Sequence, residues 1–180
     1  HVIYFRGEAS RIAKPEGKDK HRPVVGMPVV LVKIGDHCYH GLCDLGASVS
    51  AITFSLYEEI KDELAPAEIE DIDVTIKLAN RDIISPIGIL RNVEVLCGKI
   101  KYSTDFLVLS TPQDEFCPII FGRPFLNTVN AKIDCKKQTA GVSFGDESHV
   151  FNFSKFSKQP HKKDLPSKDE IIGLASIAVP

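Results

Sequence analysis

The chain has 180 residues, of which 43% are apolar, 26% charged and 8% aromatic. These fractions are ordinary for a folded domain, and they exclude collagen-like, mucin-like and wholly disordered chains. A single domain with flanking arms is expected at this length. No apolar stretch reaches the roughly 20 residues of a membrane span, so we expect no membrane partner.

The formal net charge of −2 is unevenly distributed along the chain. Residues 23–153 carry 11 basic and 18 acidic side chains, whereas residues 1–22 and 154–180 together carry 11 basic and 6 acidic ones. We therefore expect a mildly acidic folded domain at 23–153, a flexible linker at 1–22 and a flexible basic tail at 154–180. Because nucleic-acid readers concentrate basic residues on their folded part, no direct nucleic-acid binding is expected. Since the sequence begins at His1, we expect a piece of a longer protein.

The sequence contains five cysteines and no C-x-x-C pair: Cys38, Cys43, Cys97, Cys117 and Cys135. We expect reduced thiols that mostly fill the core of an intracellular protein, in the cytoplasm or the nucleus. A zinc site needs clustered Cys and His side chains at ligand spacing, and the segment 37–40 lacks the second pair. No metal and no cofactor are therefore expected.

The first predicted element is a β-hairpin. A β-branched run at 28–34 and a second run at 37–43 flank a Gly-Asp turn, a pattern typical of two paired strands. A short amphipathic helix is expected next at 54–64, because Leu and Ile recur there at helical spacing. Its cap is Thr53 or Ser55, since hydroxyl side chains are favoured at that position.

The remaining elements are mostly strands. Alternating or apolar runs predict them at 74–78, 93–95, 100–109, 118–121, 133–134 and 140–144. An exposed hairpin is expected between residues 78 and 89. A second short helix is expected to begin at Arg123, because Pro124 is tolerated in a first helical turn. The sequence thus predicts an all-β domain with two short helices.

Asp44 is the candidate catalytic residue. It follows the second strand of the predicted hairpin, and Gly46 permits a tight turn, so a half-buried carboxylate is placed where it could do acid–base chemistry. An Asp-x-Gly turn with a purely structural role is the alternative, and this motif alone favours that alternative. What changes the balance is a second motif later in the chain, an apolar run at 119–121 followed by Gly122-Arg123.

These two motifs in this order resemble the aspartic protease half-domain of retroviruses and long-terminal-repeat retrotransposons. The resemblance is strongest with plant gypsy-type elements, whose polyproteins are similar through residues 43–50, 78–88, 122–126 and 131–134. It covers about residues 24–153. It implies a retropepsin-like closed barrel, which is half of an acid protease, with a flap hairpin and a short C-terminal helix.

The resemblance implies an aspartic endopeptidase that processes its own polyprotein as a homodimer. In such enzymes two carboxylates share one proton and activate a water molecule. Asp44-Leu45-Gly46 is the only Asp-x-Gly in the sequence. We therefore expect the second carboxylate to come from a partner chain.

Further roles follow from the positions of the family's motifs. The residues expected to bind a peptide substrate are Gly46, Ala47 and Ser48 in the loop after the catalytic aspartate and Asn80, Arg81, Asp82 and Ile83 in the flap. The residues expected to support the site structurally are Leu45, Gly122 and Arg123. Gly122 fits a close approach of its strand to the catalytic loop, and Arg123 fits a buried position beneath the site.

Two positions depart from the family's pattern. Leu45 stands where many relatives carry a Thr or Ser whose hydroxyl bonds across the dimer. Ser48 stands where retroviral enzymes often carry an aspartate that pairs with the arginine, so Arg123 needs another acceptor. These departures leave open an alternative function, a catalytically silent retropepsin-fold module for dimerisation or peptide binding.

Overall fold

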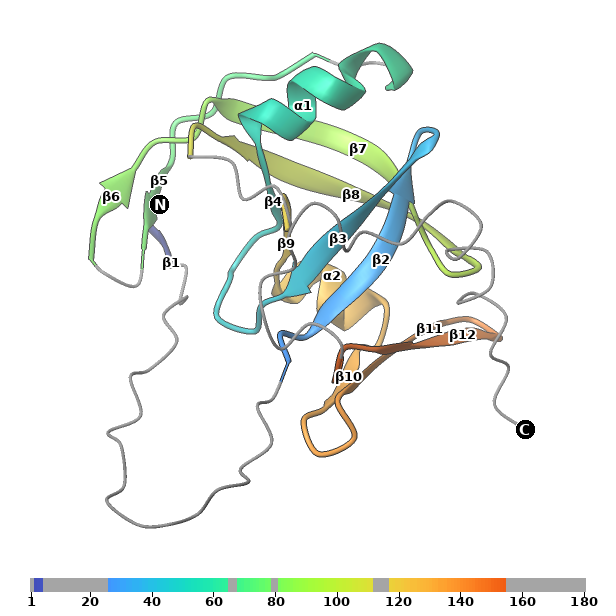
Figure 1. The fold of residues 1–180 in the computed structure, drawn as a ribbon. Helices are drawn as coiled ribbons and strands as arrows, with labels where there is room; N and C mark the ends of the chain where they lie inside the picture. The colour runs from blue at the N-terminus through green and yellow to red at the C-terminus, as the bar shows by residue number, and fades with distance from the viewer. Residues whose placement is uncertain (1, 5–25, 65–67, 79–80, 112–116, 155–180) are drawn as a thin grey trace, which may run out of the picture.

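The computed structural model describes residues 2–4, 26–64, 68–78, 81–111 and 117–154 (Figure 1). Its strands are β1 (Val2–Tyr4), β2 (Val29–Ile34), β3 (His37–Cys43), β4 (Ala51–Thr53), β5 (Thr75–Lys77), β6 (Ile83–Ile84), β7 (Gly88–Cys97), β8 (Ile100–Leu109), β9 (Ile119–Phe121), β10 (Lys132–Asp134), β11 (Thr139–Phe144) and β12 (Glu147–Asn152). The helical elements are α1 (Phe54–Ile60), a 3₁₀ turn η1 (Lys61–Glu63) and α2 (Arg123–Thr128). The predicted all-β class is confirmed.

Six strands close into a barrel in the order β2-β3-β9-β4-β8-β7, with β7 pairing back to β2. The strands alternate as a closed sheet requires: in β7 the side chains of Val93, Val95 and Cys97 are buried and those between them are exposed. The barrel is held by non-local pairings, because β9 runs parallel to β3 and antiparallel to β4. The end of β3 is thereby hydrogen-bonded to β9, a strand about eighty positions later in the sequence.

The predicted hairpin is confirmed as β2 and β3, which pair from Val29↔Leu42 to Ile34↔His37. Its turn needs Gly35, whose φ of +58° is in the left-handed region that favours glycine. The barrel therefore starts from a locally encoded unit.

The predicted helix at 54–64 is shorter than expected. Its cap is Thr53, whose Oγ1 accepts a hydrogen bond from the Leu56 amide at 3.2 Å. The α-helix ends at Ile60 and continues only as η1, whose last residue is followed by extended backbone at Leu64. The second helix, α2, begins at Arg123 with proline in its first turn, as predicted. Within the described residues, no helix is both long and apolar enough to cross a membrane.

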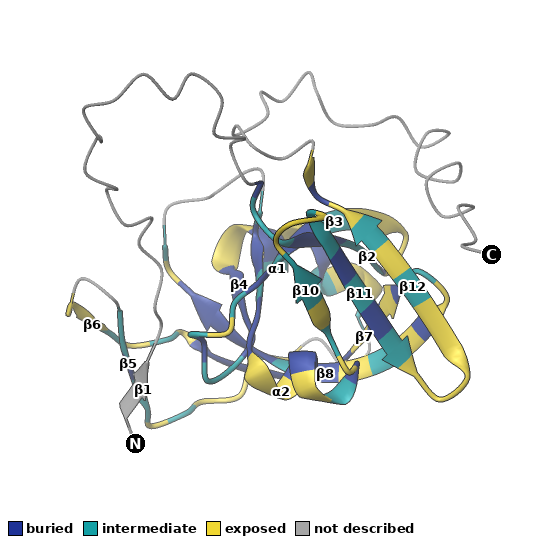
Figure 2. Cartoon of the chain, turned by 90° about the horizontal axis from the view of Figure 1, so that it is seen from below, coloured by how far each residue is buried: buried dark blue, intermediate teal, exposed yellow. Residues whose placement is uncertain are grey.

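Two small sheets lie outside the barrel, β1-β5-β6 and β10-β11-β12 (Figure 1). The strand β1 corrects the expectation of a flexible linker at 1–22 for residues 2–4, which pair in parallel with β5. This strand forms by backbone hydrogen bonds to an exposed strand edge that is distant in the sequence. The local composition of residues 1–22 therefore could not indicate it. Residue 1, the rest of that linker range and the expected tail from 155 onward lie outside the described residues. Figure 2 shows that β12 of the outer hairpin is exposed or intermediate along its length, whereas β11 carries buried residues. Phe153 after the hairpin is buried.

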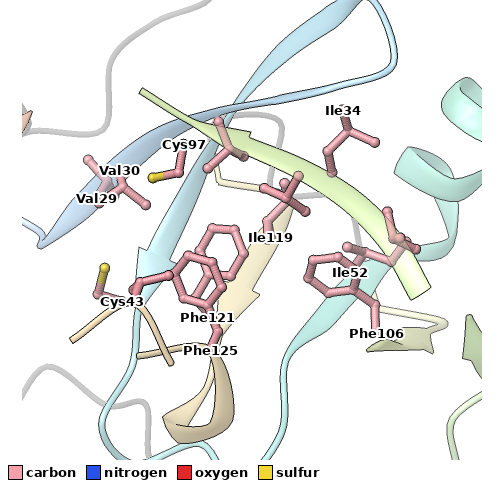
Figure 3. Close-up of a cluster of buried hydrophobic side chains, with 14 of the residues drawn as sticks. Val29, Val30, Ile34, Cys43, Ile52, Cys97, Phe106, Ile119, Phe121 and Phe125 are labelled. Carbon is pink, nitrogen blue, oxygen red and sulfur yellow. The ribbon is translucent and has the colours of Figure 1, made fainter. Parts of the chain in front are cut away.

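Two clusters of buried apolar side chains form the core. The larger cluster fills the barrel, and Figure 3 shows Phe121 and Phe125 near its centre. Their rings stack with centroids 3.9 Å apart. The absence of a side chain at Gly41 leaves space for the Phe121 ring, which a Cβ atom at that position would overlap. The smaller cluster joins the loop after β3 to β4, β5, β7 and β8 through Ala47, Ala51, Ile76, Ile89, Leu107 and Leu109.

The five cysteines are all free thiols. Three of them belong to the core, as expected: Cys43 and Cys97 are buried and Cys117 packs against the larger cluster, whereas Cys38 and Cys135 are exposed. Both exposed cysteines lie at turns: Cys38 follows the β2–β3 turn, and Cys135 begins the turn between β10 and β11. Burial raises the pKa of the Cys43 thiol to about 12, so this thiol is protonated and inert at neutral pH.

The burial of His40 makes the stability of the fold depend on pH. Burial lowers the pKa of this side chain to about 4, against about 6.5 in an unfolded chain. Between these values the unfolded chain binds a proton that the folded chain does not. The free energy of unfolding should therefore fall as pH drops from 6.5 to 4, by up to about 1.4 kcal/mol per pH unit from this group. In urea unfolding, His40→Gln should flatten that slope and leave the slope above pH 7 unchanged. An unchanged acid slope would contradict the assignment.

Candidate active site

Asp44 lies in the loop that leaves the end of β3, and its backbone is fixed on both sides. Its amide donates to the carbonyl of Phe121 in β9 at 3.0 Å, which continues the parallel β3–β9 pairing by one residue. Its own carbonyl accepts from the Ala47 amide at 3.2 Å, closing a turn. The Asp44 side chain is half-buried, and its Oδ1 accepts a hydrogen bond from the Gly46 amide at 2.7 Å. The carboxylate therefore has a fixed orientation, with Oδ1 held by the loop itself.

Gly122 is the point where the two motifs cross. A Cβ atom on this residue would overlap the backbone carbonyl of Val49, so only glycine fits there without moving the loop. The Gly122 amide donates to Oγ of Ser50 at 3.1 Å, and Ser50 is buried. The expected close approach of Gly122 to the Asp44 loop is thus present in the fold.

Arg123 joins the beginning of α2 to the same loop by four hydrogen bonds. Its backbone amide donates to the Ala47 carbonyl at 3.0 Å. Its guanidinium donates through Nη1 to the carbonyls of Leu45 and Gly46, both at 3.1 Å, and through Nη2 to Oγ of Ser48 at 2.8 Å. The acceptor that the sequence left open is therefore the Ser48 hydroxyl together with two backbone carbonyls.

The expectation that Arg123 is buried is wrong for the single chain, in which its side chain is exposed. The guanidinium reaches the loop from the outer side of the first turn of α2, where no other described element covers it. Leu45 is also exposed, with 66% of its surface accessible, although it stands directly beside Asp44. The loop thus presents a large apolar side chain and a cation to the outside, next to a fixed carboxylate.

The predicted flap corresponds to the β5–β6 hairpin. Its turn is closed by hydrogen bonds from the Leu78 amide to the Asp82 carbonyl, 2.8 Å, and from the Arg81 amide to the Leu78 carbonyl, 3.0 Å. Arg81 adopts a positive φ of 74° in this turn, and Ile83 is 65% exposed. Asn80 lies outside the described residues.

The structure brings together most but not all of the residues expected at the site. One group surrounds the crossing of the two motifs: Asp44, Leu45, Gly46, Ala47, Ser48, Gly122 and Arg123. The flap residues lie apart from this group: Ile83 is in β6 of a separate sheet, and Arg81 and Asp82 are in the turn before it. That sheet reaches the loop through Ile76 of β5, which is fully buried in the same cluster as Ala47.

Sequence reasoning missed two residues that support the site, Ser50 and Ile76. Ser50 fixes Gly122 by a side-chain bond, and nothing in a Ser-x-Ser sequence indicates a partner 72 residues away. Ile76 stood in a strand that was predicted, but its contact with the loop depends on tertiary packing. Among the described residues, no group of three or more His, Cys, Asp or Glu side chains is placed to hold a metal ion.

The sequence and the structure were compared with those of known proteins. No family model matches the sequence, and no curated protein matches it either. Among solved structures, the chain is similar to the retroviral protease-like domain of Ddi1 from Leishmania major, with a TM-score of 0.51 and 16% sequence identity. The similarity covers 66% of this chain and 90% of that domain.

The chain has a retropepsin-like fold. The predicted fold class is therefore confirmed, with its closed barrel and its crossing of the Asp44 loop over Gly122. At 16% identity the similarity concerns the fold alone. The finer resemblance to plant gypsy-type elements stays a prediction.

Proposed function

We propose that this chain is an aspartic endopeptidase of retroelement origin, similar to those of gypsy-type elements, which cleaves peptide bonds in a polyprotein as an intracellular homodimer. The observation that carries the proposal is the Asp44 carboxylate, oriented by the Gly46 amide at 2.7 Å in a loop that packs against Gly122, within a retropepsin-like fold. A plain structural turn would need neither the crossing at Gly122 nor the four bonds from Arg123.

The proposed chemistry uses two Asp44 carboxylates, one from each chain, that share a proton. The unprotonated carboxylate takes a proton from a water molecule, whose oxygen attacks the carbonyl carbon of the scissile peptide. The protonated carboxyl donates a hydrogen bond to the carbonyl oxygen, and a proton then passes to the leaving amine. The Gly46 amide uses one lone pair of Oδ1, so the other lone pair of Oδ1 and both of Oδ2 remain for the water and the partner. No metal or cofactor is required.

The proposed dimer contact includes the exposed residues beside Asp44. Two carboxylates that share a proton lie about 3 Å apart, so the neighbouring Leu45 side chains must approach the twofold axis as well. Leu45 is 66% exposed in the single chain, and a second copy would remove this apolar surface from water. Burying one such side chain stabilises an interface by up to about 1.5–3 kcal/mol.

Leu45→Glu should therefore dissociate the dimer without unfolding the chain. Two carboxylates would meet at the twofold axis beside the Asp44 pair, and like charges buried together are strongly unfavourable. Sedimentation equilibrium should show at least a tenfold weaker dimer, about 1.4 kcal/mol, with little change in thermal stability. The matched control is Phe144→Glu, which adds the same charge at another half-exposed apolar residue, on β11. Equal weakening in both variants, or none in Leu45→Glu, would contradict this interface.

One observation favours a different function, a catalytically silent module that dimerises or binds peptides. Leu45 cannot donate the hydrogen bond that a hydroxyl at this position would make across a dimer. The experiment that separates the two functions is cleavage of a denatured protein mixture at high chain concentration and mildly acidic pH, with and without pepstatin. Pepstatin-sensitive cleavage supports the endopeptidase, whereas the absence of cleavage supports the silent module.

A further inference from the structure

The flap hairpin is short, and its second edge is occupied by the chain's own N-terminal strand. β5 and β6 pair over two residue pairs, Ile76↔Ile84 and Lys77↔Ile83. A two-stranded hairpin of this size is marginally stable alone. The other edge of β5 carries β1, with Val2–Tyr4 aligned in parallel with Thr75–Lys77. In Figure 1, β6 lies on the outer side of β5, away from the barrel, and β1 lies on the opposite side.

The edge that β1 occupies belongs to the strand nearest the candidate catalytic loop. Ile76, the central residue of β5, is fully buried in one cluster with Ala47, three residues after Asp44. Leu78 and Ile84 pack against the same cluster. The edge of β5 that β1 occupies therefore belongs to the part of the flap that packs against the Asp44 loop.

We propose that β1, here called the strap, occupies the position in which an extended peptide substrate pairs with the flap. The inference rests on the proposed function and adds a competitor within the chain, since β1 holds the β5 edge that a peptide would need for strand addition. Main-chain hydrogen bonds give affinity in this mode with little dependence on sequence, so one edge can accept either the strap or a peptide.

The strap competes well for this edge but does not block it permanently. It belongs to the same chain, which gives it an effective concentration on the order of mM. It pairs through only three residues, so its release breaks few bonds. If the edge is free in only a fraction of the molecules, the apparent Kd for a peptide equals the intrinsic Kd divided by that fraction. If about nine in ten molecules hold the strap in place, releasing it should strengthen peptide binding about tenfold.

The first experiment tests the pairing without using catalysis. It compares amide hydrogen exchange at residues 75–77 in chains of all 180 residues that carry Asp44→Asn. The double substitution Ile3→Pro/Tyr4→Pro removes two strap amides, and proline disfavours a strand partner. The matched control, Ile12→Pro/Ala13→Pro, makes the same kind of change outside the strap. We expect exchange at 75–77 to become about tenfold faster in the strap variant alone. No change, or an equal change in the control, overturns the proposal.

The second experiment tests whether the strap and a peptide share the edge. A fluorescein-labelled peptide with the sequence of residues 1–8 is titrated into the same three proteins, and its anisotropy is followed. We expect about tenfold tighter binding to the strap variant than to the other two. In chains that keep Asp44, KM for a peptide substrate should fall by the same factor and kcat should stay constant. Equal peptide affinity in all three proteins overturns the proposal.

The two experiments also separate the strap from the proposed function. If no chain cleaves peptides but the strap variant binds the probe more tightly, the endopeptidase fails and the strap is supported. If cleavage occurs but neither probe affinity nor KM responds to strap release, the endopeptidase is supported and the strap fails.

Discussion

Asp44→Asn is expected to abolish peptide cleavage while leaving the fold and the dimer intact. An amide has nearly the shape of a carboxylate, and its oxygen can still accept the hydrogen bond from the Gly46 amide. It can neither take a proton from water nor hold the shared proton. Loss of acid–base catalysis costs a factor on the order of 10² to 10⁴, and here both members of the pair are lost at once. The measurement is the initial rate on a peptide substrate, alongside thermal unfolding and sedimentation.

The matched control is Asp36→Asn in the β2–β3 turn. Asp36 loses only an exposed ion pair with Lys33, 3.2 Å apart, which contributes little to stability. Its cleavage rate should equal that of the unchanged chain. Turnover retained in Asp44→Asn would rule out the mechanism, whichever family the fold belongs to.

Gly122→Ala is expected to be the most destabilising single-methyl substitution at the site. The added Cβ overlaps the Val49 carbonyl, which is backbone and cannot rotate away, so β9 and the Asp44 loop must separate. Overpacking costs about 1–3 kcal/mol in typical cores, and a backbone obstacle favours the upper end. For a chain of this length that corresponds to a melting temperature lower by about 6–12 °C. Cleavage should fall further than stability, because the loop that moves carries the carboxylate.

Gly141→Ala in β11 provides the comparison. A Cβ atom there meets its nearest neighbour, the Lys132 carbonyl oxygen, at 3.8 Å, which is ordinary contact. Alanine in place of glycine also reduces the entropy of the unfolded chain. This variant should unfold within about 0.5 kcal/mol of the original chain. If urea unfolding gave similar free energies for both variants, the close crossing at Gly122 would not be a constraint on the fold.

Features that depend on neighbouring residues could be predicted from the sequence. The β2–β3 hairpin follows from a β-branched run before Gly35 and a second short run after the Gly-Asp turn, and the Thr53 cap follows from a hydroxyl before an amphipathic run. The two motifs at Asp44 and Gly122 were recognisable because each is a short, ordered pattern. The structure places them against each other, as the resemblance implied.

Features that depend on distant parts of the chain could not be predicted. The Ser50–Gly122 bond spans 72 residues, and the acceptors of Arg123 became known only once the loop was placed. The pairing of β1 with β5 uses backbone groups that every residue carries, so no composition indicates it. The exposure of Arg123 and Leu45 depends in turn on whether a second chain covers the loop.

The central claim is that one chain supplies half of an active site, and calorimetric titration with pepstatin tests it most directly. The titration is made at a chain concentration well above the dimer dissociation constant and at mildly acidic pH. The proposed function predicts one inhibitor bound for every two chains, and loss of that binding in Asp44→Asn. One inhibitor per chain, or binding that survives Asp44→Asn, would contradict a shared carboxylate pair.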